Sequence, residues 1–234
     1  MTLLGLTYIL VGMLVAHKNG KRKVSRFRDA ERTRERLVQA AAREIYRAGF
    51  QSASLETILA ATGVTKGALY YHFDSKEALG YAVVDEVIGP DVRLAWVRPL
   101  LTDKDPIDAL IGAVRNIPVQ PVIVRGGCAL NNLAQEMSPL HAGFRKRLET
   151  AFNAWREAVA SILRRGQAEG SVRRDVKPDD AAGLLIAMVE GYGSLAKNAQ
   201  DPKVMKAGIR NIVGWLESLR SLHSLPSRGN HKRG

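Results

Sequence analysis

The chain has 234 residues, of which 46% are hydrophobic, and this suits one large or two modest soluble domains. A formal net charge of +12 and an isoelectric point near 10.1 favour a polyanionic partner, either nucleic acid or an anionic membrane surface. The single cysteine excludes an internal disulfide and fits a reducing compartment, and the five scattered histidines leave no zinc-type cluster.

The first sixteen residues are almost wholly apolar and are followed by a run of basic residues that ends at Arg28. This apolar run is shorter than the ~20 residues that a spanning helix needs, and it lacks the basic start and cleavage site of a signal peptide. One interpretation is a membrane anchor followed by stop-transfer charge. The other, adopted for residues 1–24, is a start codon assigned too far upstream or an extension outside the fold, so no membrane partner is expected.

Residues 29–48 have the spacing of an amphipathic helix, with Leu37 and Ala41 on its apolar face and arginines on the others. Gly49 is expected to end this helix. The arginines can form a solvated face paired with glutamates. Those near the start, such as Arg32, can instead contact phosphates, because the segment that follows has the pattern of a DNA-reading motif.

That segment, Leu55 to Lys76, has the pattern of two short helices joined by a tight turn. Ser54 stands at the N-cap position of the first helix, Gly63 at its left-handed stop, and Thr65 at the N-cap position of the second. Two such helices form a helix-turn-helix unit, which predicts DNA reading.

Proline, glycine and capping residues divide the rest of the chain into further helices. A helix from Lys76 is expected to be interrupted or ended by Pro90. No β-type alternation and no internal repeat occurs, so the predicted fold class is all-α with about nine helices. The remaining expected boundaries are a start at Asp105-Pro106, an irregular break at Pro118 and Pro121, a helix CALNNLAQEM, a long helix ending near Gly170, and starts at Pro178 and Pro202.

Residues 181–189, AAGLLIAMV, are apolar on every side rather than along one stripe. A helix of this kind is buried on both sides, and in a domain of this size the second side is most simply another subunit. The predicted dimer interface therefore joins this helix to the last one, through Leu184, Leu185, Met188, Ile209, Ile212, Val213 and Leu216.

The two strings RERLVQAAAREIYRAGF and SLETILAATGVTKGALYYHFDSKEAL are recognisable together. Over about residues 32–85 the chain resembles the DNA-binding domain of TetR-type transcriptional regulators. The remainder resembles that family in its helix lengths and order, and GGCALNNLAQEMS with the long helix after it is similar to one C-terminal subgroup.

The resemblance implies a homodimeric repressor whose last two helices form a four-helix bundle across the two-fold axis. A small effector enters each C-terminal domain, changes the spacing of the two DNA-reading units and releases the operator. The expected division is a three-helix DNA-binding domain at 25–76, an effector-binding and dimerisation domain at 77–222 and a disordered tail at 223–234.

The first turn of the recognition helix presents Thr65, Lys66 and Gly67 to a DNA groove, because N-terminal residues of such helices reach base edges. The resemblance assigns sugar-phosphate contacts to Tyr70, Tyr71 and His72 and a phosphate contact to Lys76. Tyr71 can alternatively be a packed strut between helices, and His72 a satisfied core histidine.

The C-terminal helices can enclose an effector pocket, although apolar residues at helical spacing are also ordinary core. Glu190, inside an apolar helix, could bind a cationic or hydrogen-bonding effector or pair with an arginine. Cys128 precedes an expected helix whose dipole would lower the pKa of its thiol, and this allows electrophile or redox sensing. The alternative is a small buried hydrophobe. The candidate lining residues are Trp96, Cys128, Met137, Phe152, Met188, Glu190 and Tyr192.

No Gly-rich phosphate loop, GxSxG or HExxH motif occurs, so an enzyme is not expected, and neither a cofactor nor a metal is. The predicted function is a cytoplasmic DNA-binding transcriptional regulator. Its predicted partners are double-stranded operator DNA, a second copy of the chain and an unidentified small effector. The alternative is an all-α enzyme or scaffold that retains the helix-turn-helix shape.

Overall fold

The computed structural model describes residues 24–221, so the expectations for the N-terminal extension and the tail fall almost wholly outside it. Over these residues the secondary structure is helical apart from one isolated antiparallel bridge between Val172 and Arg220. The predicted all-α class is confirmed. None of the helices between 24 and 221 combines the length and the apolar character required to cross a membrane.

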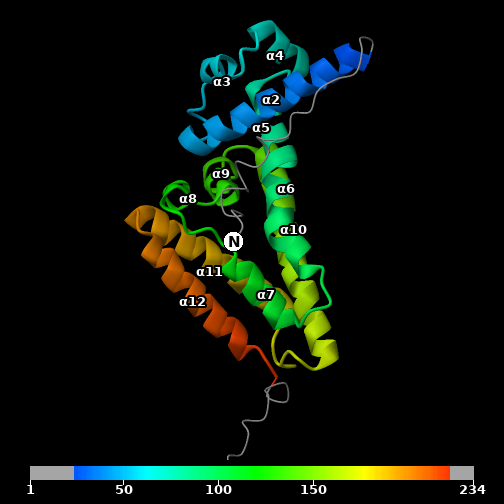
Figure 1. Ribbon diagram of the computed structural model, residues 1–234, viewed down its shortest axis with the longest axis vertical. Helices are drawn as coiled ribbons and strands as arrows, with labels where there is room; N and C mark the ends of the chain where they lie inside the picture. The colour runs from blue at the N-terminus through cyan, green and yellow to red at the C-terminus, as the bar shows by residue number, and fades with distance from the viewer. Residues whose placement is uncertain (1–23, 222–234) are drawn as a thin grey trace, which may run out of the picture.

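Three helices form the head, defined here as residues 24–73: α2 (Val24–Ala48), α3 (Leu55–Thr62) and α4 (Lys66–His72) (Figure 1, blue to cyan). The Oγ of Ser54 accepts the N–H of Thr57 at 3.2 Å, and the Oγ1 of Thr65 accepts the N–H of Ala68 at 3.2 Å. Gly63 has a φ of 64°, so both predicted caps and the predicted stop are confirmed.

A continuous helical rod, Lys76 to Leu100, leads out of the head. Its segments are α5 (Lys76–Val83), the π-helical η2 (Val84–Ile88), α6 (Gly89–Val92), the π-helical η3 (Arg93–Val97) and the 3₁₀ turn η4 (Arg98–Leu100). The expected interruption at Pro90 is wrong. The wider π-type turn directly before Pro90 opens the backbone spacing there, which relieves the clash that a proline ring makes in a regular α-helix.

Six helices form the body: α7 (Pro106–Arg115), α8 (Pro121–Gly126), α9 (Ala129–Met137), α10 (Ala142–Glu169), α11 (Pro178–Ala199) and α12 (Pro202–Ser218). Their core lies along α10, where Phe144, Leu148, Trp155, Val159 and Leu163 are almost fully buried. The irregular break expected at Pro118 and Pro121 contains the short helix α8, since Pro121 occupies the first helical position, where its missing N–H costs nothing.

The last two helices, α11 and α12, pack side by side, and α11 also packs against α10 (Figure 1). Leu185, Ile212 and Leu216 are 0% exposed in the single chain and face its own core, so their predicted role as interface residues is wrong. Met188, Ile209 and Val213 are partly buried against that core. Leu184 is exposed, and so is Leu195, which the prediction omitted.

Candidate nucleic-acid interface and internal cavity

The exposed face of α4 carries the residues predicted to meet DNA. Thr65, Lys66 and Gly67 are exposed at its start, and a Cβ on Gly67 would meet nothing within 4 Å. The Thr65 hydroxyl accepts the N–H of Ala68 and so caps the helix, and this cap fixes the direction in which Lys66 leaves the backbone. This first turn therefore offers a free lysine and an open backbone approach, as a helix that enters a groove requires.

Two tyrosines extend the same surface toward the end of α4. Tyr71 is 79% exposed and Tyr70 is 44% exposed, so the alternative of Tyr71 as a packed strut is wrong. The Tyr71 ring meets the ring of His72 edge-on, with centroids 5.1 Å apart. His72 is half-buried, while Leu69 on the opposite face is 0% exposed and anchors α4 to α2.

The basic residues around the helix-turn-helix divide into exposed and engaged groups. Arg32 is exposed. Arg34 forms a bidentate ion pair with Glu86 at 2.6 and 2.5 Å, Arg36 donates to the carbonyl of Thr62, and the Nζ of Lys76 donates to the carbonyl of Gln51 at 3.0 Å. These engaged residues brace the head, and the Lys76 ammonium keeps two further N–H donors for a phosphate.

The head meets the body at a joint formed by Phe50, Gly80, Glu136 and Phe144. The carboxylate of Glu136, near the end of α9, accepts the backbone N–H groups of Phe50 and Gln51, each at 2.8 Å. The rings of Phe50 and Phe144 lie with centroids 4.5 Å apart, and Gly80 leaves room for both. The turn after α2 is therefore fixed to the body by two charge-assisted hydrogen bonds and an aromatic contact.

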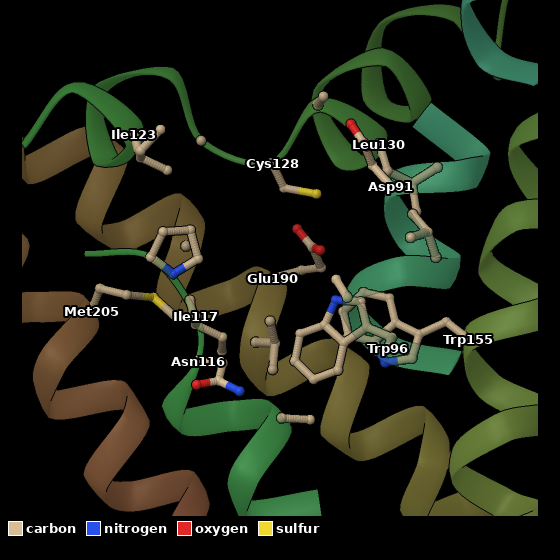
Figure 2. Close-up of a pocket in the computed structure, with 18 of the residues that line it drawn as sticks. Asp91, Trp96, Asn116, Ile117, Ile123, Cys128, Leu130, Trp155, Glu190 and Met205 are labelled. Atoms are coloured by element: carbon tan, nitrogen blue, oxygen red, sulfur yellow. The ribbon is translucent and has the colours of Figure 1, made fainter. Parts of the chain in front are cut away.

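A cavity of about 210 Å³ lies inside the body between the rod, α7, α9 and α11 (Figure 2). Of the predicted pocket residues, Trp96, Cys128 and Glu190 line it. The other four, Met137, Phe152, Met188 and Tyr192, do not. Met137, the last residue of α9, is 4% exposed and packs in the core. The Tyr192 hydroxyl accepts a hydrogen bond from Asn211 of α12 at 2.9 Å.

Sequence reasoning missed several lining residues, chiefly Asp91, Asn116, Trp155 and Met205. Asp91 follows Pro90, and the expected helix break there concealed that it shares one helix with Trp96. If the helical spacing had been continued past Pro90, Asp91 would have been placed on the same helix as Trp96. Trp155 stacks on Trp96 with centroids 4.3 Å apart and planes at 21°.

Cys128 directly precedes α9, as expected, and is its N-cap, but its thiol is not activated. Burial raises the pKa of the Cys128 thiol, and the neighbouring Glu190 carboxylate raises it further, which outweighs the backbone N–H groups of Leu130 and Asn131. The expected lowering by the helix dipole is wrong for this reason. Figure 2 shows the sulfur of Cys128 facing the Glu190 carboxyl group.

The two carboxyl groups of the cavity have altered proton affinities. Burial raises the pKa of Asp91 to about 7. Burial also raises the pKa of Glu190, against a smaller lowering by the Cys128 thiol. Among residues 24–221, no group of three or more His, Cys, Asp or Glu side chains is placed to hold a metal ion.

Known proteins resemble both parts of the chain. Residues 37–83 match the family described as bacterial regulatory proteins of the tetR family, and residues 105–212 match the tetracyclin repressor-like C-terminal domain. The HTH-type transcriptional repressor DhaR of Mycobacterium sp. strain GP1 is 31% identical over 68% of this chain and 79% of its own length. The HTH-type transcriptional regulator UidR of Escherichia coli K12 is 27% identical over 80% of this chain and 94% of its own.

The fold is shared with solved structures as well. The crystal structure of a TetR transcriptional regulator from Chloroflexus aurantiacus superimposes with a TM-score of 0.74 at 28% identity, covering 82% of this chain and 98% of that one. An exposed recognition helix, a braced helix-turn-helix and a separate helical body agree with these matches. The chain belongs to the TetR family of bacterial transcriptional regulators, DNA-binding proteins of the helix-turn-helix class that generally act as repressors.

Proposed function

We propose that the protein is a homodimeric repressor that binds a palindromic operator through two heads and is released when a small effector occupies the cavity. One observation carries this proposal: the rod that supports the head at Lys76 also walls the cavity with Ile88, Asp91 and Trp96. A ligand that displaces the rod therefore displaces the head. The hydrogen bonds of Glu136 provide a second connection, since α9 begins at the cavity with Cys128 and ends near the joint.

The dimer contact is proposed for the outer face of α11 and its neighbour α12. Leu184 and Leu195 are 47% and 58% exposed, and Ala187 and Gly191 lie exposed between them. These positions recur at helical spacing, so they form one apolar stripe with small residues at its centre. Such a stripe permits close approach of a second copy of the helix, and two heads on a two-fold axis fit two half-sites of a palindrome.

The proposed DNA contacts are Arg32, Thr65, Lys66, Gly67, Tyr70, Tyr71, His72 and Lys76. Lys66 is assigned to base edges, because it leaves the first turn of α4 into open space, and Lys76 to a phosphate. The thiol-sensing alternative is not favoured, since the raised pKa of Cys128 leaves little thiolate near neutral pH. No residue pattern in the described structure favours the alternative of an enzyme.

The test is a footprint on the intergenic DNA upstream of the protein's own gene, followed by affinity measurements at several salt concentrations. A protected palindrome and a steep fall of log K with log[salt] are expected. Lys66→Ala should change base preference at particular positions, and Lys76→Ala should weaken all sequences alike and reduce the salt slope by about one.

Lys146→Ala is the matched control, because Lys146 is exposed on α10 and carries the same charge. An equal loss of affinity in all three variants would assign the binding to net charge alone. Absence of any protected sequence at low salt would contradict the proposal.

A further inference from the structure

The cavity in the body has an acidic lining with no basic partner. Asp91 enters it from the rod and Glu190 from α11, while no lysine, arginine or histidine is among the described residues that line it. Most other lining atoms are apolar, so the two carboxyl groups stand in a medium that screens charge poorly. A carboxylate in such a place lacks a counter-charge, and a bound cation would supply it.

The aromatic side chains of the cavity also favour a bound cation. Trp96 and Trp155 form a stacked pair, and both line the cavity beside Glu190 (Figure 2). The face of an indole ring attracts a cation more strongly than other aromatic side chains do, and the attraction grows when water is excluded. The indole nitrogen of Trp155, which is 1% exposed, has no hydrogen-bond partner within residues 24–221. The lining thus presents a buried aromatic surface to whatever occupies the cavity.

The volume limits the size of a ligand. An apolar cavity of about 150 Å³ holds benzene, so a cavity of about 210 Å³ accommodates roughly ten non-hydrogen atoms. That is enough for one ring or short branched chain with a single charged centre. Large polycyclic molecules do not fit without a rearrangement of the walls.

Few titratable groups lie near the carboxyl groups of Asp91 and Glu190. Within the cavity the Cys128 sulfur faces Glu190, and the Tyr46 hydroxyl donates to the carbonyl of Gly127 at 3.0 Å. On its other side Asp91 borders a second hollow that contains Arg47, Lys197 and Glu136. Of these, Arg47 pairs with Glu44, the Lys197 ammonium is held by Asn132 at 2.9 Å, and Glu136 accepts from the joint. None of these contacts neutralises Asp91 or Glu190.

From these contacts we infer that the cavity binds a small organic monocation, an aryl- or alkylammonium of about ten non-hydrogen atoms, with its charge between Asp91 and Glu190 and its apolar part against the two tryptophans. This inference rests on the proposed function only in making that cation the effector. Because burial raises the pKa of both carboxyls, entry of a cation draws them toward the ionised form and releases protons.

The test uses the full-length protein without DNA and three probes that share a phenyl ring. Benzyltrimethylammonium carries a permanent charge, neopentylbenzene is its neutral carbon counterpart, and phenylacetate carries the opposite charge. Binding is followed by calorimetry and by the intrinsic tryptophan fluorescence, to which Trp96 and Trp155 in the cavity wall contribute alongside Trp215. The cation should bind at least about tenfold more tightly than its neutral counterpart, and phenylacetate should not bind detectably.

Substitutions then locate the charge. Glu190→Gln and Asp91→Asn should each weaken the cation about fivefold or more and leave neopentylbenzene unchanged. The control Glu149→Gln removes the same charge from the exposed face of α10 and should change nothing. Circular dichroism checks that each variant is folded. Should one variant fail to fold, the wild-type protein still decides: cation affinity should rise between about pH 6 and pH 8, and calorimetry in two buffers should register proton release.

Equal or tighter binding of the neutral or anionic probe overturns the inference, and so does cation binding that survives both substitutions. A separate arm adds operator DNA. If the protein binds DNA but not the cation, the inference fails and the proposed function stands. If it binds the cation but no DNA sequence, the proposed function fails and the assignment of the cavity stands.

Discussion

The DNA-reading surface and the cavity of this protein are built in different ways. Apart from Arg32, the surface comes from one contiguous stretch, Thr65 to Lys76, held by side-chain caps that reach only three residues along the chain. The cavity is lined by residues from the rod and from every helix of the body, brought together by the packing of α10 and α11. Local hydrogen bonding therefore decides where the head presents its side chains, whereas the cavity depends on long-range packing.

The largest effect is expected from closing the space at the joint. A Cβ on Gly80 would lie 2.6 Å from ring atoms of both Phe50 and Phe144, so Gly80→Ala overpacks the contact between head and body. We expect a loss of about 3 kcal/mol in the free energy of unfolding, because two rings must move. Urea denaturation measures this loss.

Gly112→Ala provides the control for that experiment. A Cβ on Gly112, in the middle of α7, would meet nothing within 4 Å, so this change should stabilise by about 0.5–1 kcal/mol through helix propensity alone. If both variants change the free energy of unfolding by the same amount, the joint is not a tight contact. Coupling between head and body would then have to run through other residues.

A second change breaks the connection between cavity and head without altering either. Glu136→Ala removes the acceptor for the N–H groups of Phe50 and Gln51, at a cost of about 2 kcal/mol. The isolated affinities for DNA and for the cavity ligand should change less than the coupling between them. The measurement is DNA binding with and without ligand, with Glu149→Ala as the matched control on an exposed helix face.

The same difference between local and long-range contacts explains which features could be predicted from the sequence. The caps at Ser54 and Thr65 and the stop at Gly63 were readable because each depends on residues within one turn. The joint was not readable, since Glu136 and Phe50 are far apart in the chain and nothing local marks them as partners. Their contact arises only when α9 packs beneath the head.

The cavity shows where local rules mislead. Pro90 is a valid helix breaker by propensity, yet the π-type turn before it keeps the rod continuous and brings Asp91 to the cavity. Apolar periodicity found Trp96 but could not separate a cavity wall from ordinary core, so Met137 and Phe152 were included wrongly. Glu190 was identified because a lone acid inside an apolar helix violates its own pattern.

A smaller effect tests the head alone. Thr65→Ala removes the N-cap of the recognition helix and should cost about 1 kcal/mol in stability. It should also weaken operator binding while the cavity ligand binds as before, because the cap orients Lys66 and touches nothing in the body. Thr150→Ala, in the exposed interior of α10, removes the same hydroxyl from a helix that does not need it. Comparable losses in the two variants would show that the cap does not set the geometry of α4.

The smallest effect concerns the stability of the cavity at different pH values. Since the pKa of Asp91 is raised to about 7 in the folded protein, folding favours its protonated form. Its contribution to stability is full below the ordinary pKa of ~3.9 and is lost as the pH rises through about 7. Asp91→Asn keeps the shape and removes the charge, so the variant should match the wild-type protein near pH 4 and exceed it at pH 8.

The expected excess at pH 8 is on the order of 0.5–1 kcal/mol, because Asp91 is half-buried and water screens much of the penalty. Thermal melts between about pH 4 and pH 8 measure it, with the exposed loop change Asp103→Asn as control. A variant that gains stability equally at both ends of this range would place the effect in packing rather than in charge. A gain confined to high pH would mean that the ionised Asp91 carboxyl lowers the free energy of unfolding of the wild-type protein, a loss that binding of a cation can recover.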